Sequence, residues 1–185
     1  MGYTTYFDGE IAVTPPLNEV ERAYLTKFAN SRRMLRERGP YFVDGEGFHG
    51  QDRTEDVHDH NAPPEGQPGL WCQWVPNEDG TAIEWDQGEK FYDAPEWMAY
   101  LIEHFLQPGA HAASSGETQF AGFTFDHVLN GEITAEGEES YDRWRLVVTD
   151  NAVRVDQGRV VYDGPEVELS IGDKCPTCGE EWTGA

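Results

Sequence analysis

Hydrophobic and polar residues alternate with a period of two over residues 128–148, in two runs separated by an acidic turn. Leu129 and Ile133 share one parity of the first run, and Leu146 and Val148 share one parity of the second. Such alternation predicts two strands, each with one buried and one exposed face. The intervening segment is rich in glycine, serine and acidic residues, so the two strands are expected to pair as a hairpin.

Further strands are predicted wherever short runs of aromatic and β-branched residues lie between turn signals. These runs are residues 3–13, 70–75, 81–85, 152–155 and 158–162. Because most of them are joined by short turns, neighbouring strands are expected to be antiparallel.

Apolar residues at helical spacing predict two helices. The first is expected to begin at Thr14 and Pro15, as cap and first-turn residue, and to end at about Arg36 or Arg38. The second is expected to begin after Asp93, with Glu96 completing a capping box.

The predicted order of elements is therefore β-α-loop-β-β-α-β-β-β. This order indicates an α+β fold in which two helices pack on one face of a mostly antiparallel sheet. A single domain is expected over residues 1–163, with residues 43–69 as a long, acidic, histidine-rich inserted loop. Residues 164–185 are expected to form a C-terminal tail that carries a CxxC motif.

The chain is strongly acidic, with 35 acidic against 13 basic residues and a formal net charge of −22. Six of the bases fall within residues 22–38, so the rest of the chain is even more acidic. A chain of this charge repels nucleic acid and is suited to a protein partner with a basic surface, including one whose normal ligand is DNA. The recognition surface is expected near the 128–148 hairpin, in Glu132, Glu136, Glu138, Glu139 and Asp142.

Apolar runs long enough to span a bilayer are absent from the sequence, and the first residues lack the pattern of a secretory signal. The three cysteines do not suggest a disulfide framework. We therefore expect a cytoplasmic protein.

Two cysteines in the tail, Cys175 and Cys178, have the spacing of half a zinc-ribbon site. Because zinc takes four ligands, the missing pair is expected from Cys72, from His58 and His60, or from another chain. One zinc ion that stabilises the tail is therefore a possible cofactor.

A second cluster of metal-binding side chains lies between His49 and His60 and includes three histidines and several aspartates. A divalent metal bound there would activate water for hydrolysis. Nucleotide-binding and serine-hydrolase motifs are absent, so a metal-dependent hydrolase is the enzymatic alternative. Trp71, Trp74, Trp85 and Trp97 are expected either in the core or as the wall of a ligand pocket.

Several segments resemble a group of small uncharacterised proteins encoded by bacteriophages, prophages and bacteria, including actinobacteria. The resemblance covers residues 2–33, 82–105 and 123–155 and includes GYTTYFDGEIAVTPPL at the start of the chain. It implies a phage-related accessory protein and assigns no catalytic residue.

The sequence thus favours a non-enzymatic, acidic binding protein, phage-derived, that occupies a basic surface of a host or defence protein. A metal-dependent hydrolase and a small zinc-stabilised interaction module are the alternatives.

Overall fold

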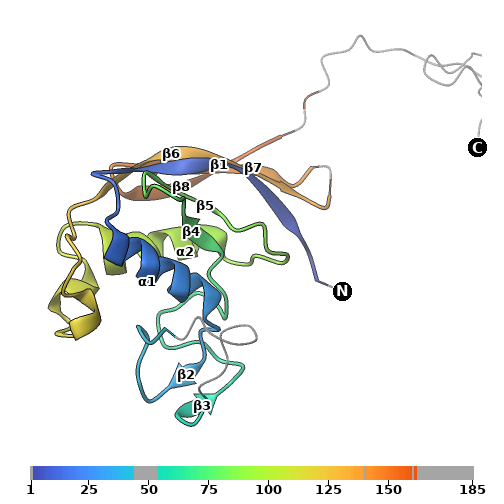
Figure 1. Ribbon diagram of the computed structural model, residues 1–185. Helices are drawn as coiled ribbons and strands as arrows, with labels where there is room; N and C mark the ends of the chain where they lie inside the picture. The colour runs from blue at the N-terminus through green and yellow to red at the C-terminus, as the bar shows by residue number, and fades with distance from the viewer. Residues whose placement is uncertain (1, 44–53, 140, 160, 162–185) are drawn as a thin grey trace, which may run out of the picture.

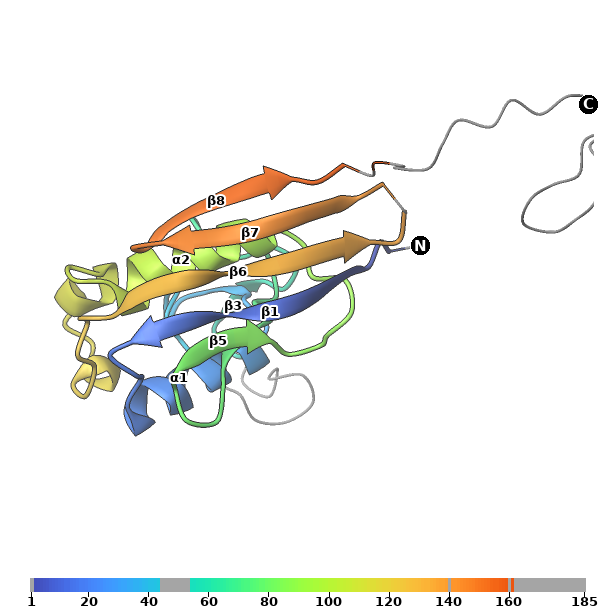
Figure 2. The same ribbon diagram turned by 90° about the horizontal axis from the view of Figure 1, so that it is seen from above.

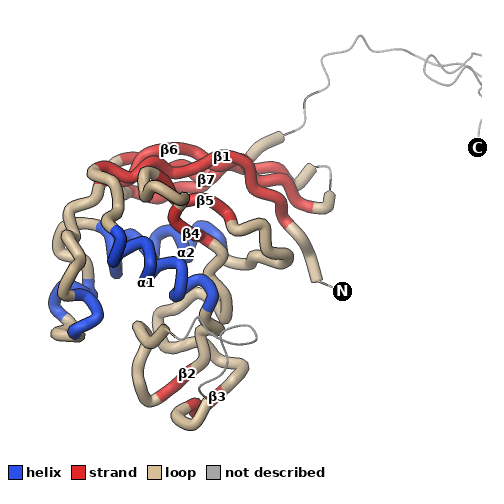
Figure 3. The backbone as a smooth tube through the Cα atoms, viewed as in Figure 1, coloured by secondary structure: helices blue, strands red, loops and turns tan. Residues whose placement is uncertain are grey.

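Six antiparallel strands form one sheet, and two helices cover one of its faces (Figures 1 and 3). The computed structural model describes residues 2–43, 54–139, 141–159 and 161. The strand order is β4-β5-β1-β6-β7-β8. Their bounds are β1 Thr5–Thr14, β4 Trp74–Pro76, β5 Ala82–Trp85, β6 Val128–Gly137, β7 Arg143–Thr149 and β8 Ala152–Gln157. The predicted α+β fold class is confirmed.

The helices are α1 (Glu19–Asn30) and α2 (Ala94–Leu101), and α2 continues into a π-helical turn at Ile102–Leu106. Two short strands, β2 (Leu35–Arg36) and β3 (Val57–Asp59), pair in a separate two-stranded sheet. Among the helices in the described part of the chain, none is both long and apolar enough to cross a bilayer.

The sheet is organised around the pairing of β1 with β6, which lie side by side along their whole length (Figure 2). Ten residue pairs join the two strands, from Thr5 with Gly137 to Thr14 with Val128. Alternate residues of β1 and β6 point towards the helices, and those side chains are buried while their neighbours are exposed. The period-two pattern of the sequence therefore gives one dry and one wet face.

The core between the sheet and the helices is mainly aromatic. Phe7 from β1 makes edge contacts with Trp74, Trp85 and Trp144, at ring-centroid distances of 5.3 to 5.8 Å. Aromatic pairs of this geometry add roughly 0.5–1.5 kcal/mol each beyond the burial of their surface. Phe7 therefore ties β4, β5 and β7 to the central strand.

The first helix is shorter at both ends than the sequence predicted. Its cap is Asn18, whose side chain accepts hydrogen bonds from the first-turn amides. The Asn18 N–H in turn donates to the Glu21 carboxylate. The helix ends at Asn30, because the Arg33 N–H donates to the Leu70 carbonyl instead of to the preceding turn. The predicted cap at Thr14 and the predicted end near Arg38 are both wrong.

The second helix begins where expected, but the predicted capping box is wrong. Asp93 has a left-handed backbone, with φ of 56°, and its side chain accepts no hydrogen bond from the first turn. The left-handed conformation directs the carboxylate away from the amides that it would cap. The helix starts at Ala94, and Pro95 fits its first turn because a missing N–H costs nothing there.

The described half of the predicted 43–69 loop packs against the domain. Residues 57–59 form β3, and Gln67 is buried, where it donates to the carbonyl of Pro40 and to the Tyr100 hydroxyl. Residues 44–53 lie outside the described residues. At the other end of the chain, β8 reaches Gln157, and residues 158, 159 and 161 do not form the additional strand that was predicted.

Two glycines allow β1 and β6 to approach closely on either side of the Glu10–Glu132 pair. Gly9 has φ of 115° and Gly131 has φ of 150°, which L side chains rarely adopt. A Cβ at Gly131 would lie 2.7 Å from the Glu10 carbonyl oxygen, and a Cβ at Gly9 would lie 2.7 Å from that of Glu132. Both contacts are with backbone atoms, which cannot move aside without disturbing the sheet.

We predict that Gly131→Ala lowers the free energy of unfolding by about 3 kcal/mol, because backbone strain and the clash with the Glu10 carbonyl act together. Gly109→Ala is the matched control: Gly109 also has positive φ, but nothing lies within 4 Å of its Cβ position. The control substitution should lower the free energy of unfolding by only about 1 kcal/mol. Denaturant unfolding of both variants tests this, and equal losses would show that the close approach of the strands contributes nothing.

Candidate functional site

The face of the sheet that the helices leave uncovered, here called the open face, is divided by charge. Within the strands that the structure describes, its basic side chains come from β7 and β8: Arg145 contacts Glu132 at 3.1 Å and Asp156 at 3.3 Å, and Arg143 contacts Glu136. These surface pairs neutralise the acids on that half of the face. Each contributes little to stability, since exposed ion pairs give at most about 1 kcal/mol.

The other half of the open face carries Asp8, Glu10 and Glu84, here called the unpaired acids. All three are exposed, and within the described part of the chain none of them forms an ion pair. Glu10 lies directly opposite Glu132 on the neighbouring strand. Like charges in that position destabilise a sheet, so this arrangement does not serve the fold.

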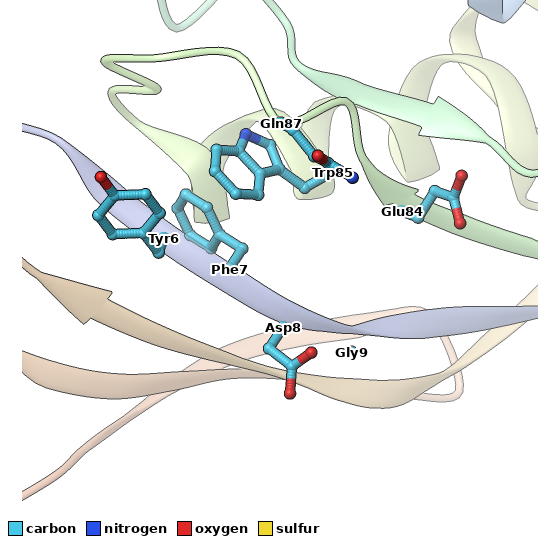
Figure 4. Close-up of a pocket in the computed structure, with 7 residues that line it drawn as sticks. All are labelled: Tyr6, Phe7, Asp8, Gly9, Glu84, Trp85 and Gln87. Carbon is cyan, nitrogen blue, oxygen red and sulfur yellow. The ribbon is translucent and has the colours of Figure 1, made fainter.

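A slot opens beside the unpaired acids, where β1 and β5 separate (Figure 4). The slot has a volume of about 400 Å³. The aromatic rings of Tyr6, Phe7 and Trp85 gather on one side, and the carboxylates of Asp8 and Glu84 lie on the other. The residues that line it are Tyr6, Phe7, Asp8, Gly9, Glu84, Trp85 and Gln87.

The aromatic side of the slot contains the Trp85 ring, which is held by contacts within the protein, and the Tyr6 ring, which is exposed to solvent. Trp85 meets Phe7 at 5.5 Å between ring centroids, and its indole N–H donates to Gln73 at 3.1 Å. Tyr6 meets Trp85 edge-on at 6.2 Å but is 62% exposed. An exposed aromatic ring beside carboxylates is suited to a cationic ligand group, which binds the ring face and the negative charge together.

The connection from β5 to α2 contributes Gln87 to the lining of the slot and is held in an unusual conformation. Gln87, Lys90 and Asp93 all have left-handed φ, at 65°, 61° and 56°. Each such residue costs roughly 1 kcal/mol when it is not glycine. Strain of this kind persists only where surrounding contacts impose it, and it concentrates at binding sites.

The five predicted recognition residues fall into two groups. Glu132 and Glu136 lie on the open face, where both are paired with arginines. The remaining three lie at the turn of the β6–β7 hairpin and contact the N-terminal segment. There Asp142 accepts from the Tyr3 hydroxyl at 2.6 Å, the Glu138 side chain accepts from the Thr4 N–H at 2.8 Å, and the Glu139 N–H donates to the Tyr3 hydroxyl.

The unpaired acids were not among the predicted site residues. The signal was present in the first strand, where Tyr6, Asp8 and Glu10 share the polar parity. This pattern alone does not identify the site acids, because the sequence does not show which acids have arginines opposite them. Strand order supplies that information, by placing the basic strands β7 and β8 on the far side of β6.

The predicted zinc ligands in the described residues differ in their exposure to solvent. Cys72 is 1% exposed, and burial raises the pKa of its thiol to about 12, which disfavours the thiolate that zinc requires. His58 and His60 are exposed, within and directly after β3. Cys175 and Cys178 lie outside the described residues, so zinc binding stays a prediction.

The described part of the histidine-rich cluster does not assemble a metal centre. Asp56 is engaged by Arg36 at 3.2 Å and by Arg38 at 3.4 Å. Within the ranges that the structure describes, no three His, Cys, Asp or Glu side chains come together as a metal-ligand group. His49 and Asp52 lie outside those ranges.

The tryptophans divide between the two predicted roles. Trp74 and Trp97 are buried core residues, at 1% and 0% exposure. Trp85 is partly buried, with one edge in the core and one in the slot, and Trp71 lines a separate surface hollow between α1 and the β5–α2 connection.

A buried polar cluster that the sequence did not reveal joins α1 to the segment before β6. Glu21 and His127 are 0% and 1% exposed, and Glu21 Oε1 lies 3.2 Å from His127 Nε2. His127 Nδ1 donates to the Pro15 carbonyl at 2.7 Å, and Thr124 donates to Glu21 from both its N–H and its hydroxyl.

The geometry of this cluster favours an ion pair. The Pro15 carbonyl oxygen only accepts, so His127 Nδ1 carries a proton, and the Glu21 carboxylate already accepts from the backbone N–H groups of Asn18 and Thr124. A carboxylate held in this way also accepts from Nε2, and His127 is then an imidazolium. Burial is the largest influence on each pKa and disfavours both charges. The mutual hydrogen bond and the backbone hydrogen bonds of the two side chains together outweigh it, so the pKa of Glu21 is lowered and that of His127 is raised. Neither residue lines the slot, and we assign the pair to the fold.

A buried arginine has a similar structural role. Arg33 is 3% exposed, donates to the Pro40 carbonyl at 2.7 Å and lies over the Phe28 ring at 4.1 Å. Burial lowers the pKa of its guanidinium to about 10. The basic residues after α1 therefore include one that holds neighbouring segments together inside the protein.

No protein-family model matches this chain, and neither a curated protein nor a solved structure shows significant similarity to it. The resemblance to phage-encoded proteins therefore stays a prediction, and function is argued from the geometry of this chain alone.

We predict that Glu21→Gln destabilises the protein by about 3 kcal/mol, because it leaves a buried imidazolium without its counter-charge. The loss should depend on pH. The lowered pKa of Glu21 makes its contribution complete only above its ordinary value of 4.5, and the raised pKa of His127 makes its contribution complete only below 6.5.

The difference in unfolding free energy between wild type and Glu21→Gln should therefore be largest between pH 4.5 and 6.5 and shrink on both sides. Chemical denaturation at a series of pH values measures it. A constant difference from acid to mildly alkaline pH would mean that the two residues do not form an ion pair.

Proposed function

We propose that this protein is a non-catalytic binding protein whose open face, along β1 and β5, holds a basic surface of another protein. The observation that carries the proposal is the position of the unpaired acids, which lie beside an aromatic slot and, among the residues that the structure describes, form no ion pair with an arginine. The partner class that we propose is a host or defence protein with a basic surface, in keeping with the phage-related resemblance.

The division of the open face explains why one half is suited to a partner. A lysine or arginine that approaches Glu132 or Glu136 must displace an existing arginine. One that approaches Asp8 or Glu84 displaces only water and finds the Tyr6 ring beside the carboxylates. The gain in binding energy is therefore greater at the β1–β5 half.

The net charge of the chain supports the same proposal. At −22, the protein generates a field that attracts basic surfaces and speeds their encounter, and it repels nucleic acid. Steering of this kind acts over a distance of about 10 Å at 0.1 M salt, so it fades as ionic strength rises.

The test compares two triple variants with the same change in charge. One neutralises the unpaired acids, as Asp8→Asn, Glu10→Gln and Glu84→Gln. The matched control neutralises exposed acids elsewhere whose side chains form no ion pair within the described part of the chain, as Glu55→Gln, Glu65→Gln and Glu78→Gln. Proteins captured from a bacterial lysate at low salt are identified, and their affinities for wild type and both variants are measured.

We expect the first variant to lose about tenfold in affinity for the captured partner, since three exposed charge contacts are worth roughly 0.2–1 kcal/mol each. The control should keep nearly full affinity, and binding by wild type should weaken as salt is raised. Equal losses in both variants would show that only net charge matters, and an affinity independent of salt would refute the proposal.

A further inference from the structure

The central strand β1 has a partner on both sides over only part of its length. On one side β6 pairs with it from Thr5 to Thr14. On the other side β5 pairs with it only at Ile11 and Ala12, together with a hydrogen bond from the Val13 N–H to the Thr81 carbonyl at 2.7 Å. Among the described residues, no strand lies on that side of residues 5–9 (Figure 2).

The hydrogen-bonding pattern shows which backbone groups are left on that side. In an antiparallel sheet, alternate residues direct both their N–H and their C=O to the same neighbouring strand. Since Val13 bonds to the β5 side, the other odd-numbered residues of β1 face that side as well. Phe7 and Gly9 therefore present their N–H and C=O groups to the slot, where β5 has already turned away.

An unpaired strand edge of this kind is a template for another strand. Proteins that bind extended peptides use such edges: main-chain hydrogen bonds give affinity, and pockets for alternate side chains give specificity. Here the pocket for side chains is the slot itself, which lies beside the edge formed by Phe7 and Gly9.

The lining of the slot specifies the chemistry of the segment that fits. Its polar side chains are the carboxylates of Asp8 and Glu84 and the amide of Gln87, and no lysine or arginine lines it. In an added strand, every second side chain would project on the open face beside these carboxylates. A lysine or arginine at those positions would also lie against the exposed Tyr6 ring.

We infer that the partner of this protein supplies an extended segment with basic side chains at alternate positions, and that this segment adds as a strand beside residues 5–9 of β1, where it continues the line of β5. The inference rests on the proposed function, since it states how the basic partner is held. It adds that recognition uses the backbone of the partner as well as its charge.

The experiment uses the full chain and a short capped peptide in which lysine alternates with valine. Two further peptides carry N-methyl groups, one on the lysine amides and the other on the valine amides. All three peptides carry the same charge. Only one of the two methylated peptides loses the amides that would face β1, because alternate amides of a strand point to opposite sides.

We expect the unmodified peptide and one methylated peptide to bind with similar affinity, and the other methylated peptide to bind at least about tenfold more weakly, as the loss of two or more backbone hydrogen bonds implies. Tyr6→Ala should weaken binding about threefold. Tyr141→Ala, a matched change of a ring that is 70% exposed at the hairpin turn, should leave it unchanged.

Equal binding by both methylated peptides would overturn strand addition and leave the proposed basic-surface binding intact. Absence of binding by the unmodified peptide at low salt would also overturn strand addition, while capture of a basic partner through the unpaired acids would still stand. If the peptide binds equally well to the Asp8→Asn, Glu10→Gln and Glu84→Gln variant, the strand site and the proposed function both fail.

Discussion

The ten-residue pairing of β1 with β6 is the interaction on which the rest of the structure depends. One parity of these two strands supplies the floor of the core, and every other strand of the sheet is attached to one side of this pair. The pairing requires glycine at positions 9 and 131, because the carbonyl of the opposite strand occupies the place of a side chain at each. In this register Glu10 and Glu132 lie opposite each other, and β1 has a neighbour in β5 only from Ile11 onward.

The same arrangement produces the two features that we connect with function. Strand order places all the basic residues of the open face on β7 and β8, so the acids of β1 and β5 keep their charge uncompensated. The separation of β1 from β5 leaves a length of β1 without a neighbour and opens the aromatic slot. Opposed glutamates, the left-handed backbone of Gln87 in the slot lining and an unpaired strand edge each cost stability. Their concentration in one region supports the proposed binding site.

The sequence predicted the fold well where local pattern decides the outcome and poorly where distant contacts decide it. The hairpin of β6 and β7, the two helices and the parity of the buried residues follow from periodicity alone. The early end of α1 depends on a bond from Arg33 to Leu70, and the buried pair of Glu21 and His127 joins residues more than a hundred positions apart. An acidic recognition surface was predicted at the hairpin of β6 and β7, and the acids of β1 and β5 were missed, because the choice among the acids depends on which strands are neighbours.

The most direct test of the account is amide hydrogen exchange along β1, measured residue by residue by NMR in the free protein. The N–H groups of Asp8 and Glu10 face β6, and those of Ile11 and Val13 face β5, so all four should be strongly protected. The N–H of Phe7 faces the open edge and should exchange orders of magnitude faster than its neighbours. Protection of Phe7 equal to that of Ile11 would show that the edge is already occupied and would contradict the account of the binding site.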